Sequence, residues 1–354
     1  MPIEDHHTAP AGPVPPAPPH PPVPPLLDVR DLAIRFGAVE AVRGLSFSVT
    51  RGETLALVGE SGCGKSATAL SLLRLLPRGG EVSAGTIRFD GQDVHKLPDA
   101  ALRRLRGGDI SMIFQEPMSS LNPVLTIGTQ IVEAIREHER LSRRSARRKA
   151  IELMDLVRIP EPHRRIDEYQ HVLSGGMRQR VMIAIAVACQ PRLLIADEPT
   201  TALDVTIQAQ ILELLDGLRR QLSMSLLLIT HDLGVVADWA DRVVVMYAGR
   251  VCEEARTELL FRDPRHPYTR GLMACSTRLG RSPHYRDGRL PEIAGSIASA
   301  TGVAGCAFAA RCPSAILTCR SQRPDARPIA DTDHVLACPV FERATSDGGD
   351  VAFS

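Results

Sequence analysis

The segment GESGCGKS, residues 59–66, has the residue types and spacing of a loop that wraps around phosphate groups. Its glycines let backbone N–H groups turn inward toward an anion, and the helical pattern that follows aims a helix N-terminus at the same point. Lys65 is predicted to reach the β- and γ-phosphates of a nucleotide, and Ser66 to bind Mg²⁺. Cys63 is expected to fill space in the loop rather than act as a nucleophile. The predicted nucleotide site comprises Gly59, Ser61, Gly62, Cys63, Gly64, Lys65, Ser66 and Ala67.

Two acidic residues follow a second apolar run further along the chain. The run at residues 193–196 is typical of a buried strand, and Asp197 and Glu198 come directly after it. Asp197 is predicted to support Mg²⁺ through water, and Glu198 to polarise the water that attacks the γ-phosphate. An acidic pair at a strand end is often only solvated. Its position after a phosphate loop favours nucleotide hydrolysis.

The segment LSGGMRQR, residues 173–180, places a serine and two glycines before a helical pattern, which is a second anion-binding helix start. This segment resembles the signature motif of ATP-binding-cassette (ABC) ATPases, and the resemblance runs unbroken to Asp204 in the D-loop. Gln115 resembles the Q-loop glutamine, and His231 resembles the switch histidine. Phe36 is similar to the aromatic residue that stacks on adenine in this family.

The resemblance implies a role for each of these residues. In ABC ATPases the signature of one subunit closes on the ATP held by another, so Ser174, Gly175 and Gly176 are expected to act in trans. Gln115 would sense the γ-phosphate and Mg²⁺, and His231 would hold the γ-phosphate. The implied catalytic residues are Lys65, Gln115, Glu198 and His231; the implied Mg²⁺ site is Ser66, Gln115 and Asp197; and Phe36, Ser174, Gly175, Gly176 and Asp204 complete the ATP site. From the residues alone, Phe36 is also compatible with core packing, His231 with capping at a strand end, and Gln115 with an ordinary polar strand end.

Four cysteines are grouped near the C-terminus at the spacing C-x5-C-x6-C-x18-C: Cys306, Cys312, Cys319 and Cys338. Structural disulfides are rare in the cytosol, so the grouping favours a metal site, either Zn²⁺ or an iron–sulfur cluster. Residues 261–272 and 305–319, with the later His334, resemble the C-terminal region of oligopeptide/dipeptide transporter ATP-binding subunits. In that family the four cysteines can hold a four-iron four-sulfur cluster. The resemblance therefore implies such a cluster here, with zinc as the alternative.

The elements that must position these residues alternate between strand-like and helical patterns. Strands are predicted at residues 27–36, 45–49, 54–58, 110–114, 193–196, 226–229 and 243–246, and helical stretches at 127–159 and 181–188. This alternation predicts an α/β fold with a largely parallel sheet. The resemblance specifies a P-loop NTPase of the ABC type with a helical subdomain, followed by a small, irregular, cysteine-rich C-terminal domain. The expected divisions are a disordered proline-rich tail (1–26), the nucleotide-binding domain (27–262, helical subdomain about 116–190), the C-terminal domain (263–345) and a disordered tail (346–354).

Composition narrows the classes of function. The 354-residue chain has a formal net charge of +1, which gives no support to a general polyanion binder. Hydrophobic residues make up 44% and aromatic residues 4%, so a core must rest on aliphatic packing. The longest apolar run, residues 181–189, is too short to span a bilayer of about 30 Å. A cytosolic protein is expected, and any membrane role must come through a partner.

Together the residues and the resemblance imply the ATP-hydrolysing subunit of a peptide importer, peripheral to the cytoplasmic face of the cell membrane. The implied partners are two membrane-spanning permease subunits, a second and homologous ATP-binding subunit in a heterodimer, and an extracytoplasmic substrate-binding protein, with no nucleic acid. One alternative is a soluble ABC-type ATPase of DNA repair or chromosome maintenance, but such proteins carry long coiled coils or large insertions. Another is the same role with nickel or another small solute as substrate.

Overall fold

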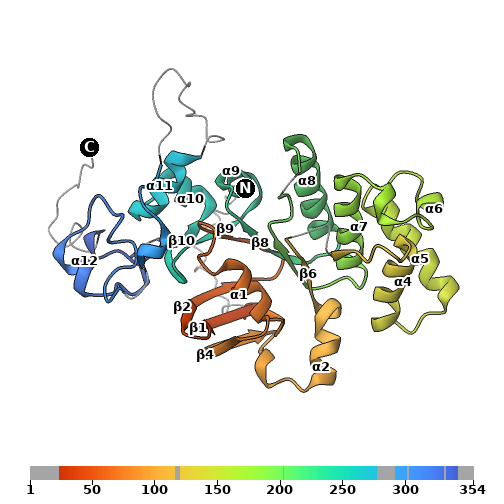
Figure 1. Ribbon diagram of the computed structural model, residues 1–354, viewed down its shortest axis with the longest axis horizontal. Coiled ribbons are helices and arrows are strands. Elements are labelled where there is room, and N and C mark those ends of the chain that lie inside the picture. Colours follow the sequence, from red (N-terminus) through yellow and green to blue (C-terminus); the bar gives the residue numbers. More distant parts are fainter. Residues whose placement is uncertain are drawn as a thin grey trace, which may run out of the picture.

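The computed structural model describes residues 24–115, 120–201, 203–276, 292–300, 303–330 and 332–341. Its largest feature is an eight-stranded sheet in the order β11-β12-β10-β9-β3-β8-β7-β6, accompanied by a four-stranded antiparallel sheet in the order β2-β1-β4-β5 (Figure 1). The larger sheet contains β3 (Thr54–Val58), β6 (Ile110–Ile113), β7 (Leu193–Asp197), β8 (Ser225–Thr230), β9 (Arg242–Tyr247), β10 (Arg250–Arg256), β11 (Arg327–Pro328) and β12 (Val335–Leu336). The smaller contains β1 (Leu27–Phe36), β2 (Val39–Val49), β4 (Gly80–Phe89) and β5 (Gln92–Asp93).

The centre of the larger sheet is parallel, and its edge beyond β9 is antiparallel. Every residue of β3, β7 and β8 is buried, as expected for strands covered on both faces. The prediction of a largely parallel α/β sheet is therefore confirmed. The helices are α1 (Lys65–Leu72), α2 (Asp99–Arg104), α4 (Ile127–His138), α5 (Arg143–Leu156), α6 (Pro162–Arg165), α7 (Gly175–Val187), α8 (Val205–Gln221), α9 (Leu233–Trp239), α10 (Thr257–Arg262), α11 (Pro267–Cys275) and α12 (Leu317–Ser321).

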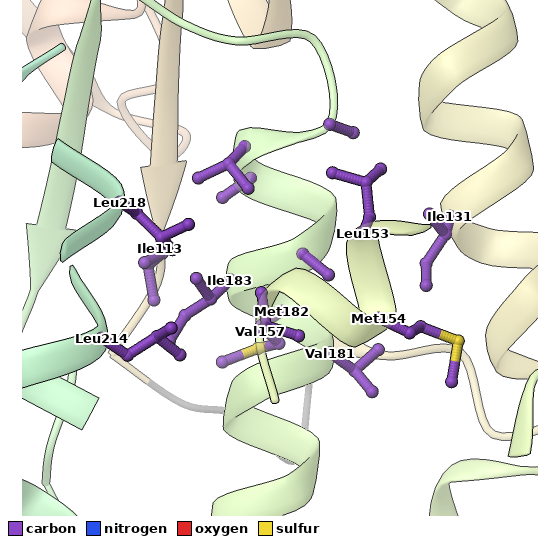
Figure 2. Packing of buried hydrophobic residues seen from close by; sticks show 14 of the residues in the cluster. Ile113, Ile131, Leu153, Met154, Val157, Val181, Met182, Ile183, Leu214 and Leu218 are labelled. Atoms are coloured by element: carbon purple, nitrogen blue, oxygen red, sulfur yellow. The ribbon is translucent and has the colours of Figure 1, made fainter. Parts of the chain in front are cut away.

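The helical stretch expected at residues 127–159 is two helices, α4 and α5, which form a helical layer beside the parallel sheet. Ser142 ends the connection by accepting a hydrogen bond from the Ser145 N–H, 3.1 Å away, and so caps α5. Helix α7 joins this layer to the rest of the protein, because its side chains pack against both (Figure 2). In Figure 2, Val181, Met182 and Ile183 of α7 lie between Leu153 and Met154 of α5 on one side and Leu214 and Leu218 of α8 on the other.

The C-terminal region shares both a sheet and a core with the nucleotide-binding part. Strand β12 pairs with β10, and β11 pairs with β12, so both continue the larger sheet. Tyr268 and Phe308 are buried in one cluster with Val58 and Val245 of the parallel strands. The expectation of a small, irregular, cysteine-rich C-terminal domain is therefore not supported by the described residues, because Tyr268 and Phe308 pack in one core with the parallel strands. Residue 262 as the end of the nucleotide-binding domain stays a prediction.

The N-terminal boundary also differs from expectation. Leu26, placed in the predicted disordered tail, is buried, and its N–H donates to the Val49 carbonyl at 2.8 Å. Residues 1–23 and the second predicted tail, 346–354, lie outside the described residues. In the part of the chain that the structure describes, no helix has both the length and the apolar character needed to cross a membrane.

Glu253 of β10 holds the C-terminal region to the sheet. Its buried carboxylate accepts hydrogen bonds from the backbone N–H groups of Arg265 (2.7 Å) and His266 (3.0 Å), and lies 2.6 Å from Nε2 of His334. Burial raises the pKa of Glu253, but the hydrogen bonds from His334 and the two backbone groups outweigh burial, and the pKa lies below its usual range. One carboxylate thereby joins β10, the start of α11 and the segment before β12.

Replacing Glu253 with glutamine should destabilise the folded protein. The amide offers one acceptor oxygen where the carboxylate offers two, so a buried donor loses its partner at a cost of about 1–3 kcal/mol at pH 7. Because the folded pKa is lowered, the carboxylate stabilises the protein above about pH 4.3, and this stabilisation is lost as pH falls through the folded pKa. Denaturant unfolding from pH 3 to 7 measures both effects. Glu258→Gln, at an exposed position in α10, is the matched control; equal losses in the two variants would contradict the assignment.

Candidate functional site

The loop at residues 59–66 connects β3 to α1 and is held by close backbone packing at both ends. A Cβ atom on Gly59 would lie 2.2 Å from the Met246 carbonyl oxygen, and one on Gly64 would lie 2.6 Å from the Ala41 carbonyl oxygen. Gly64 also has φ +103°, which side chains other than glycine rarely allow. These glycines are therefore required by the fit of the loop between the end of β9 and β2.

Two side chains of the loop point to a common centre. The Lys65 ammonium is buried and donates to the carbonyl oxygens of Gly59 (2.7 Å) and Glu60 (3.0 Å), which holds it over the loop. The Ser66 hydroxyl donates to Oδ1 of Asp197, 3.1 Å away. The structure thus brings the phosphate-binding lysine and two of the predicted Mg²⁺ ligands together. Burial raises the pKa of Cys63, which agrees with a filler residue rather than a nucleophile.

Glu198 lies at the carboxyl end of β7 and is the centre of a polar cluster. Its φ of +47° is rare for a residue with a side chain, and the strain is a common feature of functional sites. Gln115 Nε2 donates to its Oε2 at 3.1 Å, and Nδ1 of His231 lies 3.3 Å from its Oε1. The side chain of Glu198 is 13% exposed and that of His231 is 64% exposed. Of the four residues predicted to act at the γ-phosphate, Gln115 and His231 therefore meet the carboxylate of Glu198, while Lys65 lies on the loop.

A fourth member of this cluster, Thr201, was not predicted from the sequence. Its hydroxyl donates to Oε2 of Glu198 at 2.9 Å, and its backbone N–H donates to the Glu198 carbonyl at 3.2 Å. Glu198 therefore starts a tight turn, and this turn brings the hydroxyl of Thr201 back to the carboxylate of Glu198. The available sequence clue was a hydroxyl residue three positions after an acid that directly follows a buried strand.

The LSGG segment begins α7. The Ser174 hydroxyl accepts from the Met177 N–H at 3.3 Å, and the Asp204 carboxylate accepts from the Ile207 N–H at 3.0 Å at the start of α8. A Cβ on Gly176 would meet Ile207 at 2.8 Å, whereas one on Gly175 would have only an ordinary contact with Leu203. Figure 1 shows α7 well apart from α1, which follows the phosphate loop. The two predicted anion-binding helix starts, at the LSGG residues and at the phosphate loop, therefore lie apart within one chain.

Phe36 lies at the end of β1, half-buried, with its ring directly over Gly80. It packs against the large cluster of buried residues that also contains Cys63 and Ala69. Because part of the ring is exposed here, contact with adenine stays a prediction.

The four grouped cysteines carry free thiols and affect one another electrostatically. The backbone N–H of Cys306 donates to the Cys319 carbonyl at 2.7 Å. Burial, with smaller contributions from the thiols of Cys319, Cys338 and Cys312, raises the pKa of Cys306 to about 11. Within the residues that the structure describes, no three histidine, cysteine, aspartate or glutamate side chains are placed to hold a metal ion.

Two anion-binding helix starts with a single phosphate loop are typical of ATP-binding-cassette ATPases, and this is the class that the fold and the site define. Residues 42–201 match the ABC transporter family. Residues 252–319 match the family described as oligopeptide/dipeptide transporter, C-terminal region.

Relatives of similar length extend this match over most of the chain. A probable peptide ABC transporter ATP-binding protein of Sinorhizobium fredii is 52% identical over 88% of this chain and 94% of its own. The dipeptide transport ATP-binding protein DppD of Bacillus subtilis is 47% identical over the same shares. A dimeric ATP-binding cassette solved with ADP and Pi has a TM-score of 0.58 and 26% identity, covering 65% of this chain and 98% of its own. The chain belongs to the ABC transporter ATP-binding proteins of the oligopeptide/dipeptide family.

Replacing Thr201 with valine should slow ATP hydrolysis while leaving ATP binding nearly unchanged. Valine keeps the shape of threonine but removes the hydroxyl that orients the Glu198 carboxylate. Losing one hydrogen bond to a charged group supports a fall of about tenfold in kcat, with KM within twofold. Steady-state ATPase assays measure both constants, and Thr200→Val is the neighbouring control. A raised KM with normal kcat would show that Thr201 contributes to binding instead.

Proposed function

We propose that this protein is the ATP-hydrolysing subunit of an ABC transporter that imports peptides, acting at the cytoplasmic face of the membrane. The observation that carries the proposal is the combination of a complete ATP site with a C-terminal region of the oligopeptide/dipeptide type in one chain. Relatives of nearly the same length are peptide and dipeptide transport proteins, which favours this function over a nucleic-acid ATPase. The proposal extends to peptides as the solute, in preference to nickel.

The arrangement of the loop supports ATP binding with Mg²⁺. The inward-facing loop backbone and the start of α1 provide N–H donors for phosphate oxygens, and Lys65 adds a positive charge at their centre. A hydroxyl and a buried carboxylate in contact, Ser66 and Asp197, are the oxygen donors that Mg²⁺ prefers, and Gln115 adds an amide oxygen. These residues would hold the ion, and the bound ion would neutralise charge on the β- and γ-phosphates. We also place adenine against Phe36.

Hydrolysis requires a water molecule directed at the γ-phosphate. Glu198 is positioned to accept a proton from that water, because its carboxylate lies at the end of β7 beside Asp197 and is aimed by Gln115, Thr201 and His231. The exposed His231 ring is free to rotate toward the γ-phosphate. We therefore assign Glu198 as the general base and Gln115 and His231 as γ-phosphate contacts.

The second anion-binding site supports a head-to-tail dimer. Ser174, Gly175 and Gly176 start α7 away from the phosphate loop of their own chain, so we propose that they contact the ATP held by a partner ATPase subunit. Asp204, which caps α8 next to this segment, would lie at the same interface. The similar solved cassette is a dimer in a post-hydrolysis state, which supports the proposal. We propose a heterodimer with a homologous ATP-binding subunit.

An apolar patch near the helical layer supports contact with membrane-spanning partners. It comprises Val124, Tyr169 and Val172, which are 75%, 40% and 56% exposed, and Tyr169 is bridged to Thr126. Exposed apolar groups gathered on linked segments mark interaction surfaces. We propose that two permease subunits dock here and that an extracytoplasmic binding protein delivers the peptide to them.

We propose, on the resemblance and the donor chemistry, that Cys306, Cys312, Cys319 and Cys338 bind a four-iron four-sulfur cluster, with zinc as the alternative. Four free thiols grouped in one region fit a thiolate-bound group in chemistry, since bound metal removes the thiol protons. Such a group would stabilise a region with little regular structure. The reaction at the ATP site involves none of these thiols.

Glu198→Gln tests the function as a whole. The amide keeps the shape of the side chain but cannot accept the proton, so ATP binding should persist while turnover falls by at least about a hundredfold. Uptake of a labelled dipeptide should stop in cells whose only copy carries the variant. Uptake of labelled nickel in the same cells distinguishes the alternative substrate. Near-normal ATP turnover would exclude Glu198 as the base, and unchanged peptide uptake would exclude the transport assignment.

The trans site is best tested at Gly175, where an added side chain has room within the monomer. Gly175→Asp would place a carboxylate against the partner's γ-phosphate, so hydrolysis by the assembled transporter should fall by about a hundredfold or more, as for other charge clashes at buried sites. ATP binding to the isolated subunit should stay within twofold of wild type. Weakened binding in the isolated subunit would indicate that the segment acts in cis.

If the cysteines hold an iron–sulfur cluster, protein purified without oxygen should be brown and should absorb broadly at about 400 nm. Metal analysis should give about four irons per chain, and Cys312→Ser should lower that content. A colourless preparation with about one zinc per chain would replace the cluster with the alternative. Four freely alkylated thiols without metal would exclude both.

A further inference from the structure

The strongest unassigned feature is a contact between the cysteine segment and the phosphate loop. Arg311, directly before Cys312, forms a bidentate ion pair with Glu60, the second residue of the loop: Nη1 lies 2.8 Å from Oε2 and Nη2 lies 3.0 Å from Oε1. The arginine side chain is 5% exposed and the glutamate 27%. The two residues are 251 positions apart in the sequence.

The guanidinium of Arg311 makes hydrogen bonds to several other groups besides Glu60. Besides Glu60, Nη1 donates to the Tyr247 hydroxyl at 3.3 Å, Nη2 donates to the Ile293 carbonyl at 2.9 Å, and Nε donates to the Ala294 carbonyl at 2.8 Å. These contacts engage all five N–H donors of an arginine. The hydrogen bonds to Glu60 raise the pKa of Arg311 above its usual range. Lysine, with three donors on a flexible stem, could not reproduce the arrangement.

Glu60 is also held through its backbone. Its N–H donates to the Tyr268 hydroxyl at 2.9 Å, and its carbonyl accepts from Lys65 Nζ at 3.0 Å. The residue to which the phosphate-binding lysine is anchored is therefore fixed by two side chains from outside the loop. Both belong to the C-terminal region.

We propose that Arg311 is a positioning residue for ATP: by fixing Glu60, it holds the phosphate loop and Lys65 in the geometry that receives the phosphates. The proposal rests on the ATP site of the proposed function and is independent of the transported solute. In this proposal the segment that carries Cys306, Arg311 and Cys312 helps to position the nucleotide site.

The support is rigid because it is packed and hydrogen-bonded. The Phe308 ring lies edge-on to the Tyr247 ring, with 5.2 Å between the ring centroids, and its centroid is 5.3 Å from that of Tyr268. The three aromatic rings therefore pack against one another. The backbone around Arg311 turns through two hydrogen bonds, from Ala309 N–H to the Cys306 carbonyl and from Arg311 N–H to the Phe308 carbonyl. Movement of the segment would therefore move the guanidinium. By linkage, ATP binding should stabilise this segment as much as the segment favours ATP binding.

Binding of MgATP to the isolated subunit and steady-state kinetics test the proposal with four variants. Arg311→Met and Glu60→Gln should each raise the Kd and KM for ATP about tenfold, with kcat within twofold, as expected for one charged hydrogen-bonded pair. The double variant should bind ATP no more weakly than the single variant with the higher Kd. Arg311→Lys should recover only part of the lost affinity. Arg320→Met, an exposed arginine in the same region, is the control and should match wild type.

Unchanged Kd in Arg311→Met, or additive losses in the double variant, would overturn the proposal. If Arg311→Met folds poorly, the nearly isosteric Glu60→Gln still decides, because it alters only the loop partner. Hydrogen exchange gives a second readout: MgATP should slow exchange at the Ala309 and Arg311 amides at least about fivefold in wild type, and Glu60→Gln should abolish this coupling. Protection retained in Glu60→Gln would exclude the pair as the connection. Wild-type protein that binds no ATP would instead refute the proposed function.

Discussion

The ATP site depends on the register of three buried parallel strands. Val58 at the end of β3 lies beside Thr230 at the end of β8, and Asp197 at the end of β7 lies beside Ile229. Because parallel strands end at the same edge of a sheet, the phosphate loop, the acidic pair and the switch histidine emerge next to one another. A slip of one residue in either pairing would rotate Asp197 or Thr230 to the other face of the sheet and separate the groups. The apolar side chains on both faces of these strands hold that register.

This dependence explains what the sequence could predict. The runs before Gly59, Asp197 and His231 are continuously apolar, so both the strands and their common edge follow from patterning and motif order. The amphipathic outer strands were harder. Only part of β2 was predicted, and β4 and β10 were not, because bulges and exposed positions interrupt their alternation. The break between α4 and α5 was hidden in a charge-rich stretch, where Ser142 is the only cap signal.

The missed site residues share a different cause. Thr201 reaches Glu198 only because the backbone takes a positive φ at Glu198, which propensity does not foretell. Arg311 reaches Glu60 because its segment packs Phe308 on Tyr247 and Tyr268 and is bonded to the backbone at residues 293 and 294. In both cases the backbone conformation brings the two side chains together. The three-residue spacing between Glu198 and Thr201 was a clue, whereas no spacing could indicate Arg311 and Glu60, which are 251 positions apart. The resemblance assigned roles to Gln115, Glu198 and His231, which lie on different segments and meet in the structure, but it assigned none to Thr201 or Arg311.

The C-terminal region encloses the side of the phosphate loop that the two sheets leave open. The loop at residues 59–66 is clamped on one side by β2 and the end of β9, through close backbone contacts at Gly64 and Gly59. Its remaining side, at Glu60, faces the C-terminal region, where Tyr268 and Arg311 complete the enclosure. The buried Glu253 then fixes that region to β10 through three donors. Polar contacts and packed rings thus link Glu253 on β10, through His266, Phe308 and Tyr268, to Glu60 and the lysine over the loop. The C-terminal region therefore helps to hold the phosphate loop and Lys65 in place.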